Sequence, residues 1–220
     1  MLAAVAARTR TARTARTRDK DVTRARLLGA GFDEVYTHGF QAASVDRILD
    51  RLDLTKGAFF HHFPTKVDFG YALVDEVIAG MIRAQWVTPL SAADDPLTTI
   101  GDAFEDGVVA LEAAAVNLGC PLNNLAQEMS PLDDGFRLRT QQVFELWMQA
   151  YELAFRRGQT AGTVAPTVDA RAAAFALVAE IEGILSLAKN SQDRRVLRLG
   201  LANLRRHLDS LRPQRRRHRG

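Results

Sequence analysis

Apolar side chains recur at intervals of three and four residues along most of the chain, a spacing typical of helices that bury one face. Within residues 44–63, for example, Val45, Ile48, Leu49 and Leu52 fall on one side of a helix. The same pattern predicts helices over about residues 19–38, 44–51, 55–61, 66–86, 97–117, 121–129 and 133–157, with two more in the C-terminal part of the chain. The expected fold class is therefore all-α.

Two of the predicted helices are short and are separated by a tight turn. Ser44 and Thr55 precede them, and each hydroxyl can accept a hydrogen bond from the free amide groups of a first helical turn. Pro64 closes the second helix, because the residue before a proline is disfavoured in helical backbone. Two helices joined in this way form a helix-turn-helix, whose second helix can enter a DNA major groove. Periodicity alone is equally consistent with two short helices of an ordinary bundle.

Three positions carry predictions about the backbone. Gly31 lies inside the first helix at a cost of about 1 kcal/mol relative to alanine, which close packing against the second helix would explain. Gly39 is placed to end the first helix. Asp53 occupies the turn between the two short helices, and aspartate tolerates left-handed backbone better than most residues.

The composition is that of an ordinary globular protein, with 47% hydrophobic and 25% charged residues in a chain of 220. This length is sufficient for one large or two modest domains. No apolar run of about 18 residues is present, so no membrane-spanning segment and no membrane partner are expected. Cys120 is the only cysteine, which excludes an intrachain disulfide and a cysteine-rich zinc site. The first residues lack the apolar core of a signal peptide, and a cytoplasmic location is the default expectation.

Charge is distributed unevenly along the chain. Residues 1–66 carry 12 Lys/Arg against 7 Asp/Glu, whereas residues 67–212 carry 13 against 19. The formal net charge of +3 therefore combines a basic first part with an acidic second part. A basic surface favours binding to a polyanion through counterion release, and a solvated surface that is merely basic is the alternative.

Residues 1–18 contain five arginines and no acidic residue. Because they lack a sustained apolar stripe, they are expected to form a disordered basic arm. Such an arm could follow phosphates or enter a minor groove; a mis-assigned start codon and a solubilising tail are the open alternatives. The other expected domains are residues 19–66 (helix-turn-helix), 67–212 (helical body) and 213–220 (basic tail).

The second short helix carries a motif that is more specific than its periodicity. The run from Lys56 to Lys66, KGAFFHHFPTK, resembles the K-G-[small]-[apolar]-[aromatic]-x-H-F-x-x-K segment of the TetR family of bacterial transcriptional regulators. The upstream helix also fits, so the resemblance covers about residues 22–69. One departure is Phe60, where the family usually has a tyrosine whose hydroxyl donates to a DNA phosphate.

The resemblance implies the rest of the architecture and the function. It implies an N-terminal three-helix helix-turn-helix DNA-binding domain and a C-terminal helical domain for ligand binding and dimerisation. It also implies a repressor that binds double-stranded DNA at a palindromic operator and is released by a small-molecule inducer.

By the same resemblance, the second short helix faces the groove, and residues at nearby helix ends contact phosphates. The small side chains there suit close approach to DNA, and the phenylalanines divide between packing and contact with thymine methyl groups. No metal site is expected at its two histidines, because adjacent side chains on a helix point about 100° apart. The expected groove-facing residues are Thr55, Lys56, Gly57, Ala58, Phe59, Phe60, His61 and His62, and the expected phosphate contacts are Ser44 and Lys66.

The last two predicted helices carry long apolar stripes. Ala172–Ala174 and Gly183 would allow another helix to approach closely. In the TetR family these two helices form the dimer contact, and this region resembles that pattern, so a four-helix interface of a homodimer is expected. The alternative is that the stripes are internal core. The expected interface residues are Leu177, Ile181, Ile184, Ala188, Leu197, Leu201, Leu204 and Leu208.

The resemblance further implies an effector, of unknown identity, enclosed by the middle helices. The run from Gly119 to Glu128 resembles the G-C-x-x-x-N-x-x-x-E segment of one subset of regulators. Cys120 could sense electrophiles if its thiolate were stabilised, but a buried cysteine is more often an inert core residue. The expected effector-site residues are Trp86, Phe104, Val108, Cys120, Asn123, Asn124, Gln127, Trp147 and Tyr151.

Two other protein classes remain as alternatives. An enzyme is disfavoured, because the sequence has no Ser/His/Asp arrangement at motif spacing and no phosphate-binding glycine loop; no cofactor is expected. A non-specific architectural DNA-binding protein would explain the basic ends but not an acidic body with two apolar stripes. Strong preference for one palindrome would distinguish a regulator from both.

Overall fold

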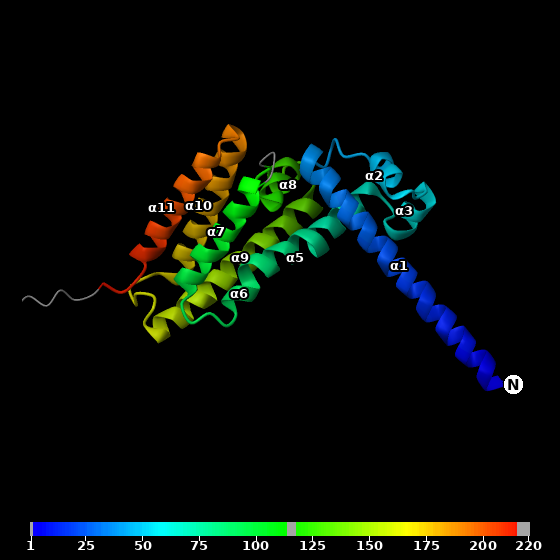
Figure 1. The fold of residues 1–220 in the computed structure, drawn as a ribbon, viewed down its shortest axis with the longest axis horizontal. Coiled ribbons are helices and arrows are strands. Elements are labelled where there is room, and N and C mark those ends of the chain that lie inside the picture. Colours follow the sequence, from blue (N-terminus) through cyan, green and yellow to red (C-terminus); the bar gives the residue numbers. More distant parts are fainter. Residues whose placement is uncertain (1, 114–117, 215–220) are drawn as a thin grey trace, which may run out of the picture. The chain divides into compact units, whose positions relative to one another are not determined.

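The computed structural model describes the backbone of residues 2–113 and 118–214 and the side chains of residues 20–112 and 118–214. Every regular element in these ranges is a helix, which confirms the all-α prediction. The chain divides into two compact units, residues 1–77 and residues 78–220 (Figure 1). None of the described helices combines the length and apolar character needed to cross a membrane.

The first unit is built from four helices. They are α1 (Leu2–His38), α2 (Val45–Leu52), α3 (Lys56–His62) and α4 (Lys66–Ala72), and the π-helical segment η1 (Leu73–Ile78) follows directly. The short helices α2 and α3 lie where the sequence predicted them. The predicted division after residue 66 falls earlier than the division between the compact units, because α4 supplies part of the first unit's core.

The first helix begins earlier than the sequence predicted. Residues 1–18 were expected to be a disordered arm, but the backbone from Leu2 onward is already α1. No glycine or proline precedes Gly29, and alanine and arginine both have high helix propensity, so nothing in the segment interrupts a helix. The side chains of the arm, and residues 215–220 of the expected basic tail, lie outside the described residues.

Three phenylalanines form the centre of the first unit's core. Phe59, Phe63 and Phe69 are each at most 2% exposed, and their ring centroids lie 5.0–5.5 Å apart. Aliphatic residues of α1 and α2, including Leu27 and Leu49, complete the cluster. The rings come from α3, the residue that ends it, and α4, so they fix these short helices against α1.

The backbone predictions for Gly39 and Asp53 are confirmed, and the structure differs from the prediction for Gly31 in one detail. Gly39 has φ 81° and ends α1, and Asp53 has φ 53° and ends α2. A Cβ atom on Gly31 would lie 2.0 Å from the Phe69 ring atom Cζ. The close neighbour of Gly31 is therefore α4, not the second helix as expected.

The second unit is a bundle of helices (Figure 1), in which α11 (Arg194–Ser210) packs against both α7 (Pro96–Ala113) and α10 (Ala170–Ser191). The predicted helix over residues 66–86 continues to Leu90 through two π-helical segments. The predicted C-terminal end of the helix over 97–117 lies outside the described residues. The elements are α5 (Ala79–Ile82), η2 (Arg83–Val87), α6 (Thr88–Leu90), α7 (Pro96–Ala113), α8 (Pro121–Met129), α9 (Asp134–Ala161), α10 (Ala170–Ser191) and α11 (Arg194–Ser210).

The last helix is held by close packing and by ion pairs. A Cβ atom on Gly200 of α11 would lie 2.3 Å from Ile184 Cγ2 of α10, so glycine permits these helices to touch. Arg198 binds Glu112 of α7 at 2.6 Å, and this hydrogen-bonded partner holds the pKa of the Glu112 carboxyl below its ordinary value. Exposed ion pairs of this kind contribute little stability individually, so packing dominates the position of α11.

Candidate functional site

The helix-turn-helix is formed by local hydrogen bonds at three residues. The Ser44 hydroxyl accepts from the Arg47 amide, and the Thr55 hydroxyl accepts from the Ala58 amide, each at 3.3 Å. Between the two caps, left-handed backbone at Asp53 reverses the chain, and the Leu54 amide donates to a carbonyl of α2. Both predicted caps and the predicted role of Asp53 are confirmed.

The amino end of α2 is fixed to α1 through Glu34. Its carboxylate accepts from the Ser44 backbone amide at 3.1 Å and from the Arg47 Nε at 2.8 Å. Burial raises the pKa of Glu34, but Arg47 and the Ser44 amide outweigh this effect and leave the pKa below its ordinary value. Arg47 also donates to the Ala42 carbonyl at 3.0 Å. This contact, which was not predicted from the sequence, holds the loop before α2.

The short helix α3 has one buried and one exposed side. Phe59 is fully buried, so its predicted contact with DNA is wrong: it lies four residues before Phe63 and shares the inward face. Phe60 is 49% exposed and packs edge-on against Phe59 with ring centroids 5.3 Å apart. Of the other predicted groove-facing residues, Ala58 and His62 are half-buried, and the exposed ones are Thr55, Lys56, Gly57 and His61.

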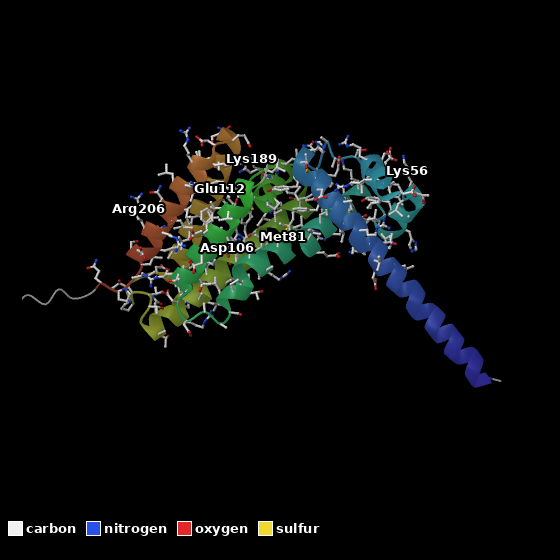
Figure 2. The ribbon with its side chains drawn as sticks, viewed as in Figure 1. Lys56, Met81, Asp106, Glu112, Lys189 and Arg206 are labelled. Carbon is white, nitrogen blue, oxygen red and sulfur yellow. The ribbon has the colours of Figure 1, made fainter. Side chains whose placement is uncertain are left out.

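The two predicted lysines have different surroundings. Lys56 extends from the surface of α3 (Figure 2), where its Nζ lies 3.0 Å from an Asp46 carboxylate oxygen. Both side chains of this pair are largely exposed, and such a pair separates at little cost. Lys66 instead donates to the Gln41 carbonyl at 3.1 Å and lies 5.0 Å from the centroid of the Phe40 ring. Lys66 therefore also supports the loop before α2.

Two cations of α1, Lys20 and Arg24, lie near the end of α3 and were not predicted from the sequence. The Arg24 guanidinium lies 4.9 Å from the centroid of the Phe63 ring and forms an ion pair with Glu76. The pKa of His62 is below its ordinary value, first because of burial and then because of the positive charges of His61, Arg24 and Lys20. The sequence feature that could have indicated Lys20 and Arg24 is the excess of basic residues before residue 27.

A metal site has no support at the adjacent histidines. The rings of His61 and His62 lie 5.4 Å apart and tilt by 72° to one another. Across the described side chains, no group of three or more His, Cys, Asp or Glu residues is arranged to hold a metal ion.

The predicted dimer stripes are the interior of the helical body. Seven of the eight predicted interface residues are at most 9% exposed within one chain, and Leu201 is half-buried. Their expected role at a dimer surface is wrong, because α10 packs its stripe against α9 and α11 of the same chain. The buried residues are Leu177, Ile181, Ile184, Ala188, Leu197, Leu204 and Leu208.

A different apolar face is exposed on the last two helices. Phe175 and Leu187 of α10 are 65% and 64% exposed, and Ala179 and Gly183 continue the same row at steps of four. Leu199 of α11 is 63% exposed. Single exposed apolar residues are normal, but a row of them on adjacent helices marks a surface suited to a partner. We call these five residues the α10–α11 face.

The predicted effector residues fall into an aromatic and a polar group. Trp86 and Trp147 stack with ring centroids 5.0 Å apart, and Tyr151 meets both rings edge-on. All three are buried, and the Trp147 Nε1 and Tyr151 hydroxyl lie near one another without forming a well-aligned hydrogen bond to each other or to another described residue. Phe104 and Val108 are buried in α7. A molecule with polar atoms could satisfy the two unpaired groups.

The polar group connects α8 to α10. Asn124 accepts from Lys189 Nζ at 2.8 Å, and Asn123 donates to the Ser186 hydroxyl at 3.2 Å. Gln127 is exposed and donates to Asn123 at 3.2 Å. These amides therefore have partners within the protein, which gives them a structural explanation independent of any effector.

Cys120 and Glu182 form a buried pair next to this group. Burial and the nearby Glu182 raise the pKa of the Cys120 thiol well above its ordinary value, which favours the inert-core explanation over electrophile sensing. Burial raises the pKa of Glu182 to about 7, although the Cys120 thiol and the Asn123 amide act in the opposite direction. Neither forms a well-aligned hydrogen bond with Glu182, whose two carboxyl oxygens are buried without a partner. Glu182 was not predicted as a site residue, because nothing in its sequence neighbourhood distinguishes it from a surface glutamate.

A surface pocket of about 240 Å³ opens between α9 and α10. None of its residues was predicted to bind an effector, and Phe175 links it to the α10–α11 face. It is lined by Glu145, Met148, Gln149, Glu152, Arg171, Ala174 and Phe175.

Two family models match the chain. Residues 27–69 match the model described as "Bacterial regulatory proteins, tetR family", and residues 96–204 match "Tetracyclin repressor-like, C-terminal domain". The first match spans the helix-turn-helix, and the second spans most of the helical body.

Individual relatives and solved structures agree with these matches. The transcriptional regulator AcuR of Cereibacter sphaeroides is 29% identical over 171 residues, 78% of each chain. The A-factor receptor protein of Streptomyces griseus is 26% identical over 171 residues, 78% of this chain and 56% of that protein. The crystal structure of regulatory protein TetR from Rhodobacter sphaeroides superposes with a TM-score of 0.75 and 28% identity, over 83% of this chain and 97% of that one. A regulator from Chloroflexus aurantiacus, at 23% identity and a TM-score of 0.77 over 87% and 96% of the two chains, shares the fold.

Proposed function

Because the chain belongs to the TetR family of DNA-binding transcriptional regulators, we propose that it is a homodimeric repressor with an inverted-repeat operator. A small molecule bound in the helical body would release it from that operator. A repressor acts on chromosomal DNA, so its place of action would be the bacterial cytoplasm. No catalytic step is part of this proposal.

The exposed side of α3 supports the DNA-reading role most strongly. Thr55, Lys56 and Gly57 at its amino end are exposed, while Phe59 on the opposite side anchors the helix in the core. A rigidly held helix with one free, partly cationic side is the arrangement that reads base edges in a major groove. The proposed groove-facing residues are Thr55, Lys56, Gly57, Ala58, Phe60, His61 and His62, with Ser44 and Lys66 at phosphates.

The α10–α11 face supports the dimer. Phe175 and Leu187 each expose more than 60% of their surface, and Ala179 and Gly183 between them leave room for a second helix to approach. A second copy of the same face would cover these residues through a two-fold axis. Two α3 helices held about 34–36 Å apart would then read successive major grooves on one side of the duplex.

The unpaired polar atoms inside the body support an effector site. Trp147, Tyr151 and Glu182 bury hydrogen-bonding atoms that have no partner in the described chain, and each such group costs about 1–3 kcal/mol. A ligand with complementary polar atoms would remove this cost. Preferential binding to one arrangement of the dimer would weaken operator binding by about 1–3 kcal/mol. A relative named as the A-factor receptor protein is consistent with a receptor role.

A salt-titrated binding assay tests the proposal. The full chain is measured against a duplex selected from the DNA upstream of its own gene and against a scrambled duplex of the same composition. A repressor binds the inverted repeat at least about 10³-fold more tightly. Equal binding to both duplexes would identify a non-specific DNA-coating protein instead.

A further inference from the structure

The first half of α1 has no role in the function proposed above. Residues 2–18 carry five arginines and no acidic residue, and their backbone is helical. Figure 1 draws this part of α1 running on past α2 and α3. The segment has no sustained apolar stripe with which to pack, so its net positive charge is its distinguishing property.

The described part of α1 places the start of this segment next to α3. Lys20 and Arg24 lie close enough to His62 to lower its pKa, and Arg24 stacks over the Phe63 ring at the end of α3. Residues 2–18 continue the same helix from that point. At a rise of about 1.5 Å per residue they extend roughly 25 Å, the length of about seven base pairs.

The spacing of the arginines indicates what kind of partner fits. Positions 8, 10, 13, 16 and 18 fall at different angles around the helix axis at about 100° per residue. This distribution does not form the single face that recognises a folded protein surface. It suits a polyanion that is contacted through charge alone, and duplex DNA is already next to α3 when that helix occupies a groove.

We propose that residues 2–18 are a second DNA-contacting element, which binds the phosphates of the duplex that flanks each half-site. The inference rests on the proposed function and extends it, because it assigns DNA contact to a part of the chain outside the helix-turn-helix. The contact is independent of base sequence. It increases affinity for long duplexes and leaves the choice of operator to α3.

The salt dependence of binding measures this contact directly. Each neutralised phosphate contributes about 0.9 to the slope of log K against log salt concentration. Because the arginines surround the helix axis, only about half of them can face one duplex at a time, so they add about 2 to the slope for each protomer. The contribution requires flanking DNA and disappears on a duplex that contains only the inverted repeat.

The test compares two charge variants of the full chain on two duplexes. One variant changes all five arginines to glutamine and the other changes them to lysine, which keeps the charge. Each is measured on the inverted repeat alone and on the repeat extended by about ten base pairs on both sides. The variants change Arg8, Arg10, Arg13, Arg16 and Arg18.

Wild type and the lysine variant are expected to bind the extended duplex at least about tenfold more tightly than the short one, with the steeper salt slope. The glutamine variant is expected to lose both differences while still preferring the repeat over a scrambled duplex. Because glutamine and lysine have similar helix propensity, unchanged thermal unfolding of both variants separates charge from folding.

Equal salt slopes for wild type and the glutamine variant on the extended duplex would overturn the inference. So would a loss, in the glutamine variant, of binding to anionic vesicles without any change in DNA binding, since the partner would then be a membrane. Neither result affects the repressor proposal. Failure of wild type to prefer the inverted repeat would remove the repressor proposal itself.

Discussion

The two units of this protein differ in where their functional polar groups lie relative to the hydrophobic core. In the first unit, Phe59, Phe63 and Phe69 form a small aromatic core, and the polar groups of interest, such as Lys56, lie outside it. In the second unit the polar groups of interest, such as Glu182, lie inside among long apolar helices. This difference fits the two proposed roles, because reading a polyanion requires a rigidly supported outer surface and binding a small molecule is favoured by buried polar groups that the molecule can satisfy.

The buried groups of the two units also contribute differently to the free energy of unfolding. Among the described side chains of the first unit, those that are buried are all apolar, so the core contributes stability without the cost of unpaired polar groups. The second unit contains buried polar atoms without partners, each of which lowers stability. The first unit should therefore lose stability when its core is altered, and the second should gain stability when its unpaired groups are replaced.

The largest effect is expected at Phe59. Phe59→Ala removes a fully buried ring from the centre of the first unit's core and should lower the free energy of unfolding by about 3–5 kcal/mol. Phe60→Ala is the matched control, because the ring of Phe60 is next in sequence to Phe59 but half exposed. This variant should lower the free energy of unfolding by less than about 1 kcal/mol while still weakening DNA binding. Urea denaturation of both variants makes the comparison, and similar losses at the two positions would contradict the assigned burial.

The next effect concerns the α10–α11 face. Phe175→Glu places a charge on a residue proposed to be covered by a second copy and should raise the dimer dissociation constant by about 100-fold or more. Leu138→Glu on α9 is the control, because Leu138 is also an exposed leucine but lies outside that face. Sedimentation velocity over a range of concentrations follows the change. A Phe175→Glu protein that remains as dimeric as the control would show that the face lies elsewhere.

The stability of the second unit is expected to depend on pH through Glu182. Burial raises the pKa of Glu182 to about 7 in the folded protein, against about 4.3 when unfolded, so the folded state holds the proton more tightly. The stabilisation from this proton is complete below the unfolded pKa and is lost as the pH rises towards 7, by up to about 3 kcal/mol. Relative to wild type, Glu182→Gln should remove this loss. Thermal unfolding of both proteins between pH 5 and pH 8 measures it, and parallel pH profiles would contradict the burial of an unpaired carboxyl.

A smaller effect distinguishes two glycines of α1. Gly31→Ala would bring a methyl group against the Phe69 ring and should cost about 1–3 kcal/mol through overpacking. Gly29→Ala, two residues earlier, meets no atom within 4 Å and should stabilise the helix by up to about 1 kcal/mol. Denaturant midpoints of the two variants should therefore move in opposite directions. Movement in the same direction would show that helix propensity, and not contact with α4, decides both.

The same contrast explains which features could be predicted from the sequence. The helix-turn-helix depends on local signals: Ser44 and Thr55 cap their helices, and Asp53 adopts left-handed backbone. These interactions involve residues three or four positions apart, so the sequence shows both partners. The side of α3 that faces the core was harder to predict from the sequence. Phe59 and Phe60 are adjacent phenylalanines, and only the position of α4 decides which one is buried.

The sequence of the second unit contains fewer local signals of this kind. The helix α10 is apolar on most of its sides, so periodicity identified a stripe but not whether it faces the same chain or a second copy. Leu177 and Ile181 belong to the interior, whereas Phe175 and Leu187 remain outside. The burial of Glu182 depends on its distance from α8, which no local pattern encodes.

The spacing between the half-sites of the operator shows whether two α3 helices are held at a fixed separation. The full chain is measured on duplexes in which the two half-sites are moved apart one base pair at a time. If an obligate dimer holds two α3 helices at a fixed separation, binding will be tightest at one centre-to-centre distance near 10–10.5 base pairs or a multiple of it, and about half a helical turn more will weaken it at least about 100-fold. Binding that does not change with the spacing would contradict the claim that this protein reads its operator as a rigid pair.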